Sequence, residues 1–146
     1  MFYEHGLRFS CERCSACCRL APGVVYLTKA DLKKLCAYFD LTEKDFVKKY
    51  CRFVMYYDGS YVLSLEETEN YDCVLWTKDG CSAYEARPVQ CSTYPFWSWI
   101  LANKKSWDEC SKDCPGINKG KLWQKEEIES QKKLYDAIIP VKQNEL

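Results

Sequence analysis

The sequence predicts a small α+β domain in which three to five helices accompany short strands and a hairpin. Three observations lead to this prediction. Apolar residues recur at helical spacing in two neighbouring stretches, a β-branched and aromatic hairpin pattern follows them, and an amphipathic stretch lies near the end of the chain. The chain has 146 residues, which is the length of one domain, and we expect a single domain over 1–146.

The first expected elements are short. Residues 7–9 are expected to be extended, and the β-branched and aromatic run 24–27 predicts a short strand. Thr28 offers an N-cap to a helix, and Asp31 three residues later resembles the second half of a capping box. The apolar positions of this helix are Leu32, Leu35, Cys36 and Phe39. A second helix is expected from Thr42 to about residue 53, with its apolar stripe at Phe46, Val47, Tyr50 and Cys51.

A hairpin is expected next, because Asp58-Gly59-Ser60 separates the aromatic and β-branched runs 53–57 and 61–65. Residues 66–72 are acidic and polar, and the run E-E-T-E within them is expected to be a solvated loop. Residues 78–80 predict a turn, and Arg87-Pro88 predicts a helix start or a bend.

The last third of the chain is expected to be mostly irregular until a terminal helix. The expectations are an extended stretch at 98–102, a turn at 103–105, a short helical stretch at 106–113 and a terminal helix at about 122–139 that stops at Pro140.

The charge balance excludes some classes of partner. Lys and Arg number 21, as do Asp and Glu, so the formal net charge is zero. We therefore expect no nucleic-acid partner, because there is no general basic field. No stretch approaches the roughly 20 apolar residues that span a bilayer, and the first residues lack a signal-peptide pattern. We expect no membrane partner and a cytoplasmic location, where thiols stay reduced.

Cysteine usage is the strongest functional signal. The chain has 11 cysteines, and four of them fall in the motif C-E-R-C-S-A-C-C at 11–18. Two C-x-x-C steps share Cys14, and each short loop can direct two sulfurs at one soft metal ion. The odd count fits a closed disulfide framework poorly, so metal binding is favoured. The candidate ligands are Cys11, Cys14, Cys17, Cys18, Cys73, Cys81, Cys91 and Cys114.

Eight thiols are enough for two four-thiolate sites, or for one cluster with spare sulfurs. Four thiolates at a tetrahedral centre match zinc or an iron–sulfur cluster. Adjacent side chains usually diverge, so Cys17 and Cys18 either serve two neighbouring sites or divide ligation and packing between them. The sequence leaves these alternatives open.

Other residues near the candidate ligands have plainer interpretations. Cys36 and Cys51 fall on the apolar faces of the expected helices and are predicted to pack as small core residues. Cys110 is either a ligand beside Cys114 or a bystander. Arg87, between two candidate ligands, is expected either to donate hydrogen bonds to sulfur or to a carboxylate such as Glu85, or to form an ordinary surface ion pair.

Four segments match a known pattern in order. They are C-E-R-C-S-A-C-C at 11–18, P-G-V-V-Y-L-T-K-A-D-L at 22–32, C-S-A-Y-E-A-R-P-V-Q-C-S-T-Y-P-F at 81–96 and C-P-G-I-N-K-G at 114–120. In these segments the chain resembles the YkgJ-type cysteine-cluster proteins, described as zinc- or iron-chelating domains. Ser15 replaces a usual glycine and Ser92 a usual arginine, and neither change removes a thiol. The resemblance implies that the same eight cysteines bind metal.

The leading interpretation is a cytoplasmic metal-binding protein with a cysteine-ligated metal core and one or two centres. Eight clustered thiols exceed the needs of one structural zinc, which favours iron or an iron–sulfur cluster over zinc. Two alternatives remain. A related cysteine pattern occurs in flagellin lysine methylases, which keeps a methyl-transfer or redox enzyme open. A metal-stabilised interaction module would instead dock a protein partner on aromatic residues around Trp97 and Trp99.

Overall fold

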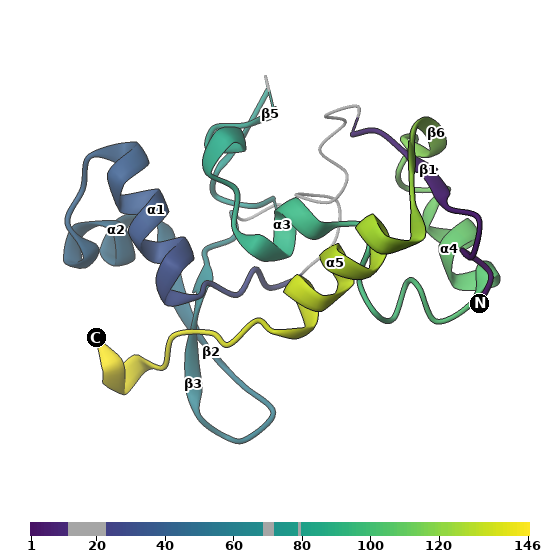
Figure 1. The fold of residues 1–146 in the computed structure, drawn as a ribbon. Coiled ribbons are helices and arrows are strands. Elements are labelled where there is room, and N and C mark those ends of the chain that lie inside the picture. The colour runs from purple at the N-terminus through teal and green to yellow at the C-terminus, as the bar shows by residue number, and fades with distance from the viewer. Residues whose placement is uncertain (12–22, 69–71, 79) are drawn as a thin grey trace. The chain divides into compact units, whose positions relative to one another are not determined.

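The computed structural model describes residues 1–11, 23–68, 72–78 and 80–146 (Figure 1). Within these residues the chain forms five α-helices and short antiparallel strand pairs, which confirms the predicted α+β class. The chain divides into two compact units. The first joins Met1–Cys17 to Thr93–Ala137, and the second joins Cys18–Ser92 to Ile138–Leu146. A single domain over 1–146 therefore stays a prediction.

Two helices open the described part of the second unit. Helix α1 spans Lys29–Phe39, and Thr28 caps it as predicted. The capping box is complete, because Asp31 N donates to Thr28 Oγ1 at 3.0 Å and Thr28 N donates to Asp31 Oδ2 at 3.1 Å. Helix α2 spans Glu43–Tyr50 with Thr42 as its N-cap. It ends before residue 53, because Cys51 pairs with Leu65 and begins a strand, so the placement of Cys51 on a helix is wrong.

The predicted hairpin is confirmed. Strand β2 spans Cys51–Met55 and pairs antiparallel with β3, Tyr61–Leu65. Gly59 in the turn has a φ of +86°, a conformation that glycine adopts without strain. The run 24–27 is extended beside β3 but forms no full strand, since among the described residues it makes a single antiparallel bridge, between Tyr26 and Ser64. Val25 O nevertheless accepts from Leu65 N at 3.0 Å.

The rest of the second unit is built from short pieces. Strands β4 (Trp76–Thr77) and β5 (Gly80–Cys81) pair on either side of the predicted turn, of which Asp79 lies outside the described residues. The short helix η2 (Tyr84–Ala86) precedes α3 (Val89–Thr93). Helix α3 starts directly after Pro88, so of the helix start or bend expected at Arg87-Pro88, the helix start is observed. The helix η3 (Gln143–Glu145) lies near the end of the chain. The buried cluster of this unit is Leu27, Leu32, Leu35, Cys36, Phe46, Leu63, Leu65, Leu75, Ala83, Ala86 and Val141.

The first unit contains a strand pair and two helices. Strand β1 (Leu7–Phe9) is confirmed and pairs antiparallel with β6 (Ile117–Trp123), which the sequence did not predict. Helix α4 spans Lys104–Cys110 and α5 spans Lys125–Asp136. The buried cluster of this unit is Tyr3, Phe9, Phe96, Ile100, Leu101, Trp107, Cys114, Ile117 and Ile128.

Two predictions in the first unit are wrong, and a third is confirmed with shifted bounds. Residues 98–102 form turns instead of an extended stretch, since Ile100 N and Leu101 N both donate to Trp97 O at 3.0 and 2.9 Å. Residues 103–105 begin a helix instead of a turn, because the Asn103 side chain accepts from Ser106 N at 2.8 Å. The short helical stretch expected at 106–113 exists, but it begins and ends earlier, as α4.

The terminal helix is shorter than the expected 122–139. Its N-cap is Gln124, because residues up to Trp123 belong to β6. Its end precedes Pro140, because the chain after Ala137 leaves the helix and pairs in the second unit, where Val141 N donates to Leu27 O at 2.9 Å. No helix in the described ranges combines the length and the apolar character that crossing a bilayer requires.

Candidate metal centre

Five of the eight candidate ligands lie in the described part of the chain. Cys14, Cys17 and Cys18 lie outside it, as does the expected loop around them. Cys11 is exposed, Cys114 is buried, and Cys73, Cys81 and Cys91 are half-buried. The last three belong to the second unit, and the first two belong to the first unit. Among the residues that the model describes, no three His, Cys, Asp or Glu side chains gather closely enough to hold a metal ion.

Cys73 and Cys81 lie at the two ends of one short, hydrogen-bonded segment. Cys73 forms an isolated antiparallel bridge with Glu67, and Val74 N donates to Glu66 O at 2.9 Å. Cys81 pairs with Trp76 in the β4–β5 ladder. The main chain around both thiols is therefore held by its own backbone hydrogen bonds, which is the local order that a metal-binding loop needs.

Cys91 lies in the short helix α3, and the start of this helix is fixed by a buried carboxylate. Asp31 is 1% exposed, and its Oδ1 accepts from Val89 N at 3.1 Å. The other oxygen of Asp31 closes the α1 capping box. One carboxylate therefore satisfies main-chain donors at the start of two helices, and this ties the helix of Cys91 to α1.

The neighbour of Cys91 reaches the segment that follows the cysteine motif. Gln90 Oε1 accepts from Tyr26 N at 2.9 Å, and Gln90 Nε2 donates to Val24 O at 2.8 Å. An amide side chain that both accepts from and donates to one extended segment fixes its position along the chain. Val24 lies six positions after Cys18 in the sequence, so this contact connects the chain that follows the motif to the helix of Cys91.

The same segment is also held near Cys73. Gly23 N donates to Glu67 Oε1 at 3.2 Å, and Gly23 O accepts from Arg52 Nη2 at 2.8 Å. Arg52 Nη2 also pairs with Glu67 Oε1 at 2.5 Å. The expectation that the run E-E-T-E at 66–69 is a solvated loop is therefore wrong at Glu67, whose side chain is only 15% exposed.

In the first unit, strand pairing brings the chain around Cys11 and Cys114 together. Phe9 pairs with Ile117, and Ser10 N donates to Gly116 O at 3.3 Å. A Cβ at position 116 would collide with the carbonyl oxygen of Ser10, so this close approach requires glycine. The two candidate thiols thus belong to adjacent antiparallel segments.

Three further cysteines have free thiols with the character of core residues. Burial, followed by the nearby Cys36 and Glu66, raises the pKa of Cys51 to about 12. Burial, followed by Glu43, raises the pKa of Cys36. Both pack in the cluster of the second unit, which supports the predicted packing role even though Cys51 begins a strand. In the first unit burial, with lesser contributions from Asp113 and Glu109, raises the pKa of Cys110.

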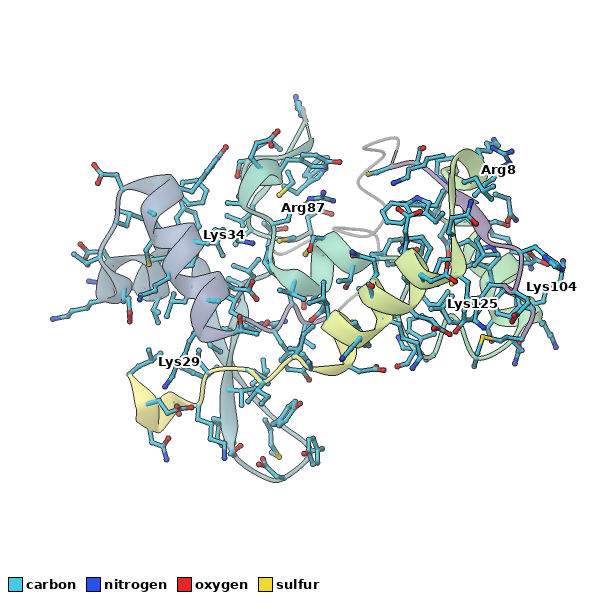
Figure 2. All side chains as sticks on the ribbon, viewed as in Figure 1. Arg8, Lys29, Lys34, Arg87, Lys104 and Lys125 are labelled. Atoms are coloured by element: carbon cyan, nitrogen blue, oxygen red, sulfur yellow. The ribbon has the colours of Figure 1, made fainter. Side chains whose placement is uncertain are left out.

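Arg87, which is labelled in Figure 2, contacts neighbouring main chain and an aromatic ring. Its Nε donates to Tyr84 O at 3.1 Å, and its guanidinium carbon lies 3.9 Å from the centre of the Tyr84 ring. Lys34 of α1 donates to Arg87 O at 2.7 Å. These contacts fix the main chain between Cys81 and Cys91.

Sequence reasoning missed the side chains that organise these segments. Arg52 lay outside every motif, Gln90 was part of the matching segment 81–96 but was given no role there, and Glu67 was hidden in an acidic run. Only Asp31 had a usable signal, its spacing from Thr28, and that signal predicted one of its two roles. The donors that remain, soft cysteine thiols on short ordered segments, fit zinc or iron.

Comparison with known proteins identifies the family of the chain. An uncharacterized protein of Methanocaldococcus jannaschii is 29% identical over 138 residues, covering 89% of this chain and 45% of that protein. The chain thus spans less than half the length of this relative. No solved structure matches the chain. A family model matches residues 10–115, and on this match the chain belongs to the CxxCxxCC family, described as a "putative zinc- or iron-chelating domain".

Proposed function

We propose that this chain holds zinc or iron through cysteine thiolates. The proposed ligands are Cys11, Cys14, Cys17, Cys18, Cys73, Cys81, Cys91 and Cys114. One observation carries the proposal beyond family membership. The segment that follows the cysteine motif is hydrogen-bonded on one side to Glu67, the bridge partner of Cys73, and on the other to Gln90, the neighbour of Cys91. Segments far apart in sequence are thus held together next to their thiols.

We further propose two centres with four thiolates each. Among the described candidates, Cys11 and Cys114 belong to the first unit and Cys73, Cys81 and Cys91 to the second. The adjacent side chains of Cys17 and Cys18 are not expected to serve one ion in the same way. We therefore assign Cys14 and Cys17 to a first set with Cys11 and Cys114, and Cys18 to a second set with Cys73, Cys81 and Cys91. Each set supplies the four donors of a closed tetrahedral site. Cys110, whose pKa is raised, is left outside both sets.

Iron, or an iron–sulfur cluster, is the first form that we propose, and zinc is the form that the same donors also accept. The cytoplasm, where thiols stay reduced, remains the expected compartment. The test is metal and sulfide analysis, with an absorption spectrum, on protein purified without oxygen. Two metal centres per chain support the two-centre proposal. A single centre refutes it, and a chain that binds neither metal refutes thiolate metal binding itself.

A metal-stabilised interaction module is the second candidate function, and one observation favours it. Trp99 is 57% exposed, whereas Trp97 is half-buried and stacks on Tyr135 with ring centres 5.1 Å apart. Trp99 is therefore the residue of this pair that a protein partner can cover. Copurification of a partner that is lost on Trp99→Ala supports this role, and a variant that retains every partner refutes it.

An enzyme would differ from a closed metal site and from an interaction module, because it would keep one metal coordination position for water or substrate. Added exogenous thiols that change the metal absorption spectrum support such an open position, and an unchanged spectrum counts against it. A methyl-transfer or redox role for the chain stays a prediction until that measurement.

A further inference from the structure

The ion pair between Arg52 and Glu67 contacts Gly23, and Glu67 is the bridge partner of Cys73. Arg52 comes from β2, and Glu67 follows β3 along the chain. Together they contact both polar main-chain groups of Gly23: the N–H donates to Glu67 Oε1 at 3.2 Å, and the carbonyl accepts from Arg52 Nη2 at 2.8 Å. Because both groups are engaged, the pair restrains the rotation of this peptide segment as well as its position.

Glu67 is also part of the main chain that leads to Cys73. The bridge between Glu67 and Cys73 is flanked by two backbone hydrogen bonds, Thr68 N to Asp72 O at 2.8 Å and Val74 N to Glu66 O at 2.9 Å. Gly23 lies five positions after Cys18. The ion pair therefore fastens the chain that leaves the motif to the chain that carries Cys73.

The burial of this pair suggests that it serves more than stability. The side chains of Arg52 and Glu67 are 31% and 15% exposed, whereas those of the surface pair Lys29–Glu145 are 74% and 36% exposed. Arg52 Nε and Glu67 Oε2 are buried without a hydrogen-bond partner among the described residues. A poorly satisfied buried ion pair is often no more stable than apolar side chains of the same size. Buried polar groups with unmet hydrogen bonds therefore call for another reason to be present.

We infer that Arg52 and Glu67 are positioning residues for the thiolate metal site, and that they hold the chain that follows the cysteine motif, at Gly23, against the chain that carries Cys73. This inference rests on the proposed thiolate site. The pair has no net charge, so it can orient the two segments without adding to the negative charge that clustered thiolates carry. Outer residues that orient metal ligands are worth about 10- to 100-fold in metal affinity.

The test compares Glu67→Ala and Glu67→Gln with a matched control, Glu145→Ala. The Glu145 carboxylate likewise accepts one main-chain N–H, from Lys142 at 2.9 Å, and pairs with one cation, Lys29 at 3.0 Å, but no candidate ligand is near it in sequence. Zinc affinity is measured by competition with a chromophoric chelator. Substitution with cobalt adds a spectroscopic readout, because the intensity of the thiolate-to-cobalt absorption reports the number of bound sulfurs. Thermal unfolding of the metal-free proteins measures any purely structural effect.

We expect Glu67→Ala to lose at least about tenfold in zinc affinity and part of the thiolate-to-cobalt absorption. Glu67→Gln keeps an acceptor for Gly23 and is expected to lose less, while Glu145→Ala matches the wild type. If Glu67→Ala fails to fold, Glu67→Gln decides: affinity and absorption equal to those of the wild type overturn the inference. Equal values in a folded Glu67→Ala overturn it as well. A wild-type chain that shows no thiolate absorption with cobalt refutes the proposed function, which is a different failure.

Discussion

The carboxylate of Asp31 offers the sharpest test of how the second unit is built. Substitution by alanine removes the acceptor for Thr28 N, at 3.1 Å, and for Val89 N, at 3.1 Å. Asp31 is 1% exposed, so water cannot easily replace it. A lost capping interaction costs about 1 kcal/mol, and a buried donor left without an acceptor costs about 1–3 kcal/mol. We therefore expect Asp31→Ala to lower the free energy of unfolding by about 2–4 kcal/mol.

The assay is urea-induced unfolding of metal-free, reduced protein, followed by far-ultraviolet circular dichroism. Asp45 provides the control, because it holds the same third helical position in α2 but its side chain is exposed and closes no capping box. Asp45→Ala should cost less than about 1 kcal/mol. Asp31→Asn keeps only one carbonyl oxygen and should fall between the two. An Asp31→Ala variant that loses no more stability than Asp45→Ala would refute the account of one carboxylate holding two helix starts.

Three further outcomes are expected. Cys91→Ser should lose metal from its centre by metal analysis, while Cys36→Ala keeps the wild-type content; full occupancy in Cys91→Ser contradicts the ligand assignment. The pKa of Cys51 is raised to about 12, so between pH 9 and 12 the thiol loses its proton in the unfolded chain but keeps it in the folded chain. The contribution of Cys51 to the free energy of unfolding therefore falls by roughly 1 kcal/mol per pH unit as pH rises. In urea unfolding of metal-free protein, the free energy of unfolding should fall less steeply with pH in Cys51→Ala than in the wild type. Equal slopes in the two proteins count against this prediction. Gly116→Ala should destabilise the first unit by more than 2 kcal/mol, since its Cβ would collide with the main chain, whereas Gly23→Ala, whose Cβ meets nothing within 4 Å, should not.

Local signals in the sequence predicted local structure well. The Thr28 cap and the Asp58-Gly59-Ser60 turn act between residues close together in the chain, so α1 and the β2–β3 hairpin are confirmed. Strand β6 was missed because its sequence, I-N-K-G-K-L-W, lacks strand alternation and contains a glycine at positive φ. Its pairing with β1 is held by contacts more than 100 positions apart, such as Trp123 Nε1 to Phe9 O at 2.8 Å. No propensity in a short window reports such a partner.

The candidate site also has one part that the sequence predicted and one part that it did not. Thiol spacing predicted a metal-chelating family, because the cysteine thiols are themselves the soft ligands and can be read directly from the sequence. The side chains that hold the cysteine segments could not be predicted, because an acid in an acidic run and a glutamine beside a cysteine look like surface residues until the fold supplies their partners. Glu67 and Gln90 acquire their roles only through Gly23, Val24 and Tyr26, which lie more than 40 positions away.

The two hydrophobic clusters indicate how much folding would depend on a bound metal. A small domain that relies on metal to fold usually lacks a core of its own. Here each unit buries its own cluster, one around Phe46 and Leu63 and the other around Phe96 and Trp107, and all four side chains are at most 1% exposed. Within the described residues, the candidate thiols Cys73 and Cys81 pack against the cluster of the second unit. Since apolar burial already supplies a driving force for folding, the proposed thiolate site is not needed for it, and the polar contacts at Gly23 and Gln90 fix the segments next to the candidate thiols.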